Sequence, residues 1–218
     1  MILRFFTALM LLVVLFPGVG RAQFVTTPEP LTVAQTDELL RERVPLLVRL
    51  PSASKKLDFY RKKRTEDPAN ASSYQRRIDQ IIAERDAANR LLITYLDSLY
   101  TVQPLHYFYD RDSRTLREGT ARPLLNAALE PQPNLVPPER YLVLHVGNRI
   151  GGSGQGLNGL QLLDANYQPL PYGVPSFSRR GGFGALWRAL GNRARAEERD
   201  VERMVTRLHR RVNNYLEN

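Results

Sequence analysis

The sequence predicts an α+β or α/β fold, in which a sheet of three to four strands is packed by one long helix and a C-terminal amphipathic helix. Three observations lead to this fold class. Residues 72–99 keep a helical spacing of apolar side chains over about seven turns, three short apolar runs follow, and a second amphipathic stretch begins at Asn192. Amphipathic helices and half-apolar strands must cover each other, so we expect them in separate layers.

The first 22 residues have the order of a cleavable signal peptide. Arg4 supplies the positive charge, residues 5–16 form an apolar run, and Gly20-Arg21-Ala22 places small residues where a signal peptidase requires them. The run is shorter than the ~20 residues of a membrane span, which favours cleavage over retention as an anchor. The sequence therefore predicts an exported protein, periplasmic or extracellular and associated with a bacterial envelope.

We expect the mature chain to begin at Gln23, because the small residues of the cleavage site end at Ala22. The mass of the native protein recovered from cells measures this directly. An intact Met1 in the folded product would contradict it.

Composition restricts the class of protein. The 218 residues include no cysteine, which excludes disulfides, thiol catalysis and a lipoprotein anchor. The net charge is +9, and cleavage would leave +7 because residues 1–22 hold Arg4, Arg21 and no acidic residue. A basic protein attracts anionic partners. The partner is unidentified; the candidates are an anionic membrane surface or an envelope polymer, nucleic acid is not expected, and no cofactor is expected. The alternative is a solvated, arginine-rich surface.

Composition and periodicity divide the chain into a signal peptide, a leader that is extended and helical, and a single α+β domain. That domain is helical at first, then contains the sheet, and ends in a basic loop and the C-terminal helix. The boundaries are 1–22, 23–50 and 51–218, with 51–101, 102–175 and 176–218 as the three parts of the domain.

Two short helices are expected before the long one. Thr36 is the expected N-cap of the first, which Pro45 ends, and residues 53–64 form the second, which Asp67-Pro68 ends.

The stretch 72–99 is the clearest element. Its apolar stripe has two possible partners, namely a sheet on which the helix lies, or a second helix in a coiled coil, and the first is the ordinary arrangement. The apolar positions are Tyr74, Ile78, Ile81, Ile82, Ala88, Leu91, Leu92, Tyr95, Leu96 and Leu99.

Three strands are expected after the long helix, at 105–109, 141–146 and 159–164, because each is a short apolar run bounded by turn-forming or polar residues. Residues 165–168 form a plausible turn into a short fourth strand near Leu170. Residues 119–140 contain five prolines and are expected to be mostly loop.

The arrangement over residues 70–175 resembles a group of small exported bacterial proteins of unknown function. The resemblance rests on the long helix that runs into His106-Tyr107-Phe108-Tyr109-Asp110, on residues 159–164, and on Pro169-Leu170-Pro171-Tyr172. The resemblance implies a fold and a cellular location, and it implies no activity.

Asp110 and Asp112 are candidates for catalytic residues. The segment from Asp110 to Thr115 follows an expected strand and resembles the D-x-D-x-T sequence of haloacid-dehalogenase-type phosphatases, whose first Asp attacks phosphorus and whose second is the acid and base. Thr115 stands one residue too late, and no lysine follows Lys63. A turn rich in Asp and Ser is the default interpretation.

His106 and His145 are candidates for metal ligands, because both fall on expected strands. If those strands pair in one sheet, the two histidines and Asp110 or Asp164 could bind a metal. A histidine on a strand with one hydrogen bond is the commoner case.

Residues 154–159 spell G-x-G-x-x-G, the spacing of a dinucleotide-binding turn. That turn leads into a helix whose N-terminus holds the pyrophosphate. Here the expected strand at 159–164 follows instead, so a loop is the better interpretation.

An arginine-flanked aromatic segment is the candidate for contact with an anionic surface. Its apolar residues have the helical spacing of a segment that lies on a membrane, with arginines at the headgroups. The alternative is a short helix that docks Trp187 on the core. The candidate residues are Arg179, Arg180, Phe183, Leu186, Trp187 and Arg188.

The leading hypothesis is an exported envelope protein that acts by binding, as a non-catalytic or structural module with a basic surface. No complete nucleophile, metal or phosphate constellation is visible in the sequence. The alternative is a metal- or acid-dependent, phosphatase-like hydrolase that uses Asp110, Asp112 and a histidine.

Overall fold

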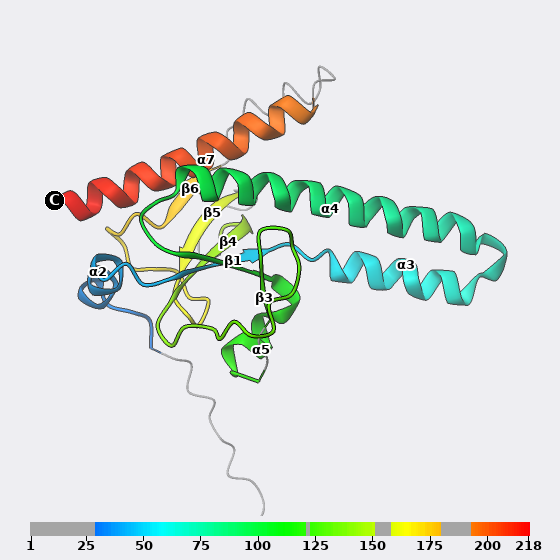
Figure 1. Ribbon diagram of the computed structural model, residues 1–218, viewed down its shortest axis with the longest axis horizontal. Coiled ribbons are helices and arrows are strands. Elements are labelled where there is room, and N and C mark those ends of the chain that lie inside the picture. The colour runs from blue at the N-terminus through cyan, green and yellow to red at the C-terminus, as the bar shows by residue number, and fades with distance from the viewer. Residues whose placement is uncertain (1–28, 121–122, 151–157, 180–192) are drawn as a thin grey trace, which may run out of the picture.

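The computed structural model describes residues 29–120, 123–150, 158–179 and 193–218. Within them the chain forms a mixed α/β fold, an open six-stranded sheet with five α-helices (Figure 1). The helices are α2 (Val33–Arg41), α3 (Ser54–Glu66), α4 (Ala71–Leu99), α5 (Ser113–Arg117) and α7 (Arg193–Glu217), with short 3-10 turns η1 (Pro68–Asn70) and η2 (Asp110–Asp112). The strands are β1 (Leu46–Leu50), β2 (Leu105–Tyr109), β3 (Leu124–Leu125), β4 (Leu142–Asn148), β5 (Asn158–Leu163) and β6 (Phe177–Arg179).

The sheet has the order β3-β2-β1-β4-β5-β6, with β1 near its centre. β1 is parallel to β2 and to β4, whereas β3, β5 and β6 pair antiparallel with their neighbours. The register places Arg49 of β1 beside Phe108 of β2 and His145 of β4. His145 in turn faces Gln161 of β5. Partners in register project from the same face, so these four side chains form one row across the sheet.

One face of the sheet carries the main core. The second half of α4 and α7 lie side by side over this face (Figure 1). Apolar residues of β1, β4 and β5 meet them there, among them Val48, Leu144, Leu160 and Leu162, all completely buried. The opposite face buries a smaller cluster around Phe108, covered by Leu116 of α5 and Leu124 of β3. Arg49 and His145 lie on this second face, because they alternate with Val48 and Leu144.

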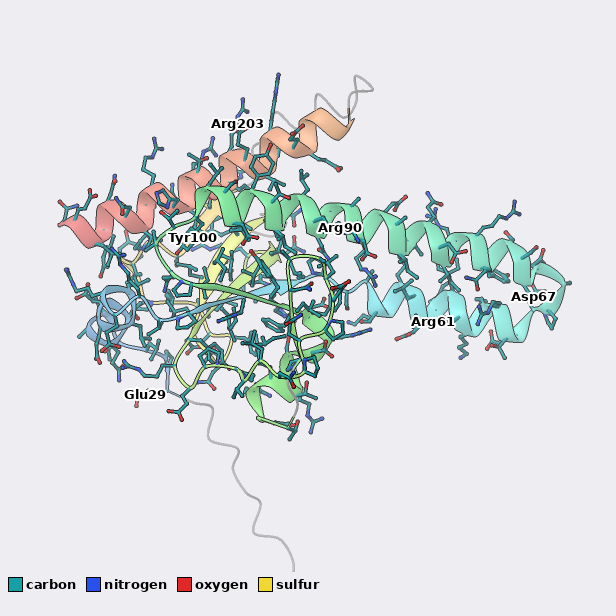
Figure 2. All side chains as sticks on the ribbon, in the orientation of Figure 1. Glu29, Arg61, Asp67, Arg90, Tyr100 and Arg203 are labelled. Atoms are coloured by element: carbon teal, nitrogen blue, oxygen red, sulfur yellow. The ribbon has the colours of Figure 1, made fainter. Side chains whose placement is uncertain are left out.

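α3 and the first half of α4 form a helical hairpin, here called the arm, which extends beyond the sheet (Figure 1). Its small core consists of Leu57, Ile78 and Ile81, with Tyr60 packed against it. At its tip the Tyr74 hydroxyl donates a 3.2 Å hydrogen bond to Asp67. Figure 2 labels Asp67 at the tip of the arm and Arg61 on α3.

The structure confirms the long helix and the C-terminal helix, and it shows α3 and the strands at 105–109, 142–148 and 158–163 close to their predicted positions. The long helix has two partners, since its second half covers the sheet and its first half pairs with α3. The expected arrangement on a sheet therefore holds for half of its length.

Other expectations were wrong. The sheet has six strands where three to four were expected. The additional strands, β1, β3 and β6, were not predicted. β1 lies inside the stretch assigned to a leader, so the folded domain begins before residue 51. Near Leu170 there is an isolated bridge between Leu163 and Pro169 in place of a strand. The N-cap of α2 is Thr32, whose hydroxyl accepts from the Gln35 N–H, whereas Thr36 is buried inside the helix.

Candidate functional site

The strongest polar cluster of the described residues lies where β1 and β2 end. The connection that leaves β1 leads to α4 on the main-core face, and the one that leaves β2 leads to α5 on the opposite face. Adjacent parallel strands whose connections leave to opposite faces open a crevice beyond their carboxyl ends, where open α/β sheets bind ligands. The fold therefore points to this edge as a candidate binding site.

The loop after β1 is fixed from two directions. The Ser52 N–H donates a 2.9 Å hydrogen bond to a carboxylate oxygen of Asp110, which follows β2. From α4, the buried Asn89 donates to the Pro51 carbonyl oxygen at 3.1 Å, and Arg85 donates to the Ser52 carbonyl oxygen at 3.4 Å. This edge of the site is therefore rigid before any ligand arrives.

Arg49, near the end of β1, is the centre of the cluster. Its Nε–H donates to the Ser113 hydroxyl at 2.9 Å, and its Nη1 donates to Nδ1 of His145 at 3.3 Å. The guanidinium carbon lies 5.4 Å from the centre of the Tyr167 ring, within range of a cation–π interaction. The Tyr167 hydroxyl donates to the Ser113 carbonyl oxygen at 3.1 Å, so ring and hydroxyl are themselves held in place.

Arg49 forms no ion pair with an Asp or Glu of the described chain, although it is half-buried. Two other arginines at this edge do have acidic partners. Arg85 pairs with Asp86 at 2.7 Å and Arg111 with Asp112 at 3.6 Å, and both lie beside the Tyr109 ring. The positive charge of Arg49 thus has no partner carboxylate among the described residues.

His145 is held neutral in one tautomer. A guanidinium has only donors, so Nδ1 must accept from Arg49, and the ring proton lies on Nε2, which donates to the Asn148 carbonyl oxygen at 3.0 Å. Burial, together with the Arg49 charge, lowers the pKa of His145 below its ordinary value, while the bond to Asn148 and the Asp110 charge act in the opposite direction. His145 therefore orients Arg49 and adds no charge of its own at neutral pH.

The two candidate catalytic carboxylates have separate contacts. Asp110 binds the Ser52 N–H through one carboxylate oxygen, and its carbonyl oxygen accepts from the Ser113 hydroxyl at 2.6 Å. Asp112 pairs with Arg111, and its carbonyl oxygen accepts from the Thr115 hydroxyl, while its side chain makes no cap hydrogen bond to α5. Asp110 thus belongs to the site as a residue that holds its loops, and Asp112 lies at its rim.

The two candidate metal ligands lie on strands that are not neighbours, because β1 separates β2 from β4. In register, His106 is beside Leu47, whereas His145 is beside Arg49, two residues further along β1. Asp164, a further candidate, accepts hydrogen bonds from the N–H groups of Asn166 and Gln168 in the turn after β5. No group of three or more His, Asp or Glu in the described part of the chain has the arrangement to hold a metal ion.

Most of the arginine-flanked aromatic segment lies outside the described residues, namely Arg180, Phe183, Leu186, Trp187 and Arg188. Arg179 ends β6 and is exposed. Of the G-x-G-x-x-G stretch, Gly154 and Gly156 also lie outside the described residues, and Gly159 is in β5.

Sequence reasoning missed Arg49 and Tyr167. A signal for Arg49 exists in the sequence, since Leu46–Leu50 is an apolar run between Pro45 and Pro51 whose fourth residue is charged. A charged residue in such a run marks a position where the strand meets something polar. Tyr167 gave no comparable signal, because its contact depends on the fold of a distant turn.

No known protein family, curated protein or solved structure matches this chain. Among the described helices, none combines the length and the apolar character that a membrane crossing requires.

Proposed function

We propose that the protein is an exported, non-catalytic binding module of a bacterial envelope, and that it holds the acidic group of an anionic ligand at Arg49. The observation that supports this most is a half-buried guanidinium near the end of the central strand, without a carboxylate partner in the described chain. A cation that is partly removed from water loses hydration free energy, and an anion from outside would offset that loss.

The contacts of Arg49 suit it to this role. A guanidinium has about five N–H donors, and the contacts to Ser113 and His145 use two of them. The donors that remain can form a paired contact with a carboxylate or a phosphate. Because Ser113, His145 and Tyr167 already fix the side chain, little conformational entropy is lost when a ligand binds.

Export and attraction to anionic partners complete the proposal. Export rests on the order of charge, apolar run and small residues in 1–22. α3 carries all four lysines of the chain together with Arg61 and Arg64, against two acidic residues, and the exposed Phe59 lies between Lys56 and Lys62. An anionic membrane surface or envelope polymer would be attracted to such a helix.

We expect Arg49→Gln to weaken the binding of inorganic phosphate or acetate by about tenfold or more, because a paired contact to an anion would be lost. Amide chemical shifts of Ser52 and Ser113 during titration measure the dissociation constant, and comparing the two anions distinguishes phosphate from carboxylate recognition. Arg49→Lys keeps the charge without the planar guanidinium and should lie between wild type and Arg49→Gln.

The matched control is Arg90→Gln, which removes the same charge from an exposed position on α4 (Figure 2). It should leave the dissociation constants unchanged. Equal weakening by both variants would mean that net charge, and not the Arg49 site, attracts the anion, and the proposal would then be wrong. A melting curve of each variant separates loss of binding from loss of fold.

A hydrolase that uses Asp110, Asp112 and a histidine remains the alternative hypothesis. Its support is that Asp110, Ser113 and His145 lie in one cluster. Both ring nitrogens of His145 and the Ser113 hydroxyl have partners inside the cluster, which favours binding over nucleophilic chemistry. Stoichiometric metal in the purified protein that is lost on His145→Ala would favour the hydrolase.

A further inference from the structure

A second site lies at the other end of the sheet, beside β5 and β6. A cavity of about 750 Å³ opens there between Arg149, the segment 169–177 and the last turns of α7. Pockets of roughly 300–1,000 Å³ suit a small organic ligand and are far larger than an inorganic anion needs. Gln161, which faces His145 in the row across the sheet, lines this cavity, but Arg49, Ser113, His145 and Tyr167 do not, so it is a separate feature.

Two arginines stand at this cavity. The guanidinium carbon of Arg149 lies 5.3 Å from the centre of the Phe177 ring, and Arg211 of α7 donates a 2.5 Å hydrogen bond to the Phe177 carbonyl oxygen. Neither arginine forms an ion pair within the described residues, and no described Asp or Glu lines the cavity. Unpaired arginines at a concave site favour an anionic ligand.

The remaining wall is apolar and aromatic. Leu170 and Val174 are buried at its base, and Phe177 and Tyr215 also line it. Tyr172 lines the cavity as well, yet its side chain is fully exposed, at 102% of the reference area. A large aromatic ring left entirely in water gains free energy when a flat apolar group covers it.

The wall is formed before a ligand binds. Pro169, Pro171 and Pro175 restrict the backbone of this segment, and the Leu162 N–H donates to the Ser176 carbonyl oxygen at 2.7 Å. On the opposite side, the buried Gln161 side chain binds both the N–H and the carbonyl oxygen of Ile150, at 2.7 and 3.0 Å. Both sides of the cavity are therefore tied to the sheet.

We propose that this cavity binds an organic anion with a flat apolar body. Its acidic group pairs with Arg149 and Arg211, and its ring lies against Phe177 and Leu170 with Tyr172 as the outer wall. An inorganic anion would leave the apolar wall uncovered, and a neutral aromatic molecule would leave both arginines without an anionic partner. The ligand class thus needs both properties together.

The test is a titration of the full mature chain with 1-naphthoate, followed by amide chemical shifts of Leu170, Val174 and Phe177. We expect 1-naphthoate to bind about tenfold or more tightly than its neutral counterpart 1-naphthalenemethanol, because one charge-assisted hydrogen bond contributes enough binding free energy for that ratio. Acetate, which has the charge without the ring, should perturb these amides only at much higher concentration.

Two variants and one control locate the site. Arg211→Gln should reduce the preference for naphthoate over the neutral compound, and Tyr172→Ala should weaken both compounds, with an unchanged melting temperature since the ring is exposed. Arg207→Gln removes the same charge from an exposed position on α7 and should change neither. Equal affinity for the two naphthalene compounds, or an unchanged preference in Arg211→Gln, would overturn the proposal. Arg49→Gln should leave this binding intact, so the two proposals can fail independently.

Discussion

Substitution of Ile81 by aspartate is expected to unfold the arm while the sheet stays folded, whereas Leu96→Asp is expected to unfold the whole domain. Both residues are buried on α4, at 3% and 0% exposure, yet their neighbours differ. Ile81 packs with Leu57 and Ile78 inside the arm. Leu96 belongs to the main core, between the sheet and the helices α4 and α7. A buried, unpaired carboxylate costs several kcal/mol in either place.

The difference lies in what depends on each cluster. α3 makes its main contacts with α4 and the turn between them, so loss of the arm core should release α3 without opening the sheet. Leu96 touches the core shared by α4, α7 and the sheet. A loss of about 4 kcal/mol there is a large fraction of the 5–15 kcal/mol by which small domains are stable.

Hydrogen exchange distinguishes the two outcomes. In Ile81→Asp, amides of α3 should exchange fast while those of β1 and β4 stay protected; in Leu96→Asp, protection should disappear throughout. The control is Ala83→Asp, which adds the same charge to α4 at an exposed position and should alter neither region. Loss of protection in β1 and β4 in Ile81→Asp would show that the arm and the sheet fold as one unit.

These contrasting partners explain how far the sequence could predict the fold. The apolar period of α4 shows that one side is buried, and this was predicted correctly, but a period does not show what covers the stripe. The first half of α4 packs against α3, and the second half packs against the sheet. Only the tertiary arrangement, set by the turn at residues 67–70, decides between them.

The central strand was missed for a similar reason. Leu46–Leu50 is five residues long, and a run of that length is compatible with a strand, a linker or the end of a helix. What makes it a strand is pairing with β2 and β4, more than fifty residues away in each case. Arg49 was therefore missed as well. The sequence singled out Asp110 and His145 of this candidate site, but not the cation that contacts His145 directly and Asp110 through Ser113.

Replacement of Gly159 by alanine is expected to separate β6 from the sheet. A Cβ at this position would lie 2.2 Å from the Ser178 carbonyl oxygen and 2.9 Å from a carbon of the Phe177 ring. The carbonyl oxygen belongs to the backbone, so it cannot move away by a change of side-chain rotamer. From the sequence, Gly159 is expected to end a glycine-rich loop and to begin the strand at 159–164. The structure gives it a different role, as the position where β5 and β6 approach too closely for any side chain.

The expected effect is large because β6 joins several parts of the fold. The buried Ser178 hydroxyl donates a 2.9 Å hydrogen bond to the Met204 carbonyl oxygen of α7, and displacement of β6 would break it. Overpacking typically costs about 1–3 kcal/mol, and with this bond lost we expect about 3 kcal/mol or more. Urea denaturation measures the loss in the free energy of unfolding.

Gly119→Ala is the matched control, since Gly119 has a φ of +64° but nothing within 4 Å of the added carbon. It should cost only the left-handed backbone strain of an alanine, about 1–2 kcal/mol. If Gly159→Ala is no more destabilising than Gly119→Ala, the close approach of β5 and β6 is absent in solution. Phe177 moves with β6 and lines the cavity, so Gly159→Ala should also abolish the preference for 1-naphthoate, whereas Gly119→Ala should preserve it.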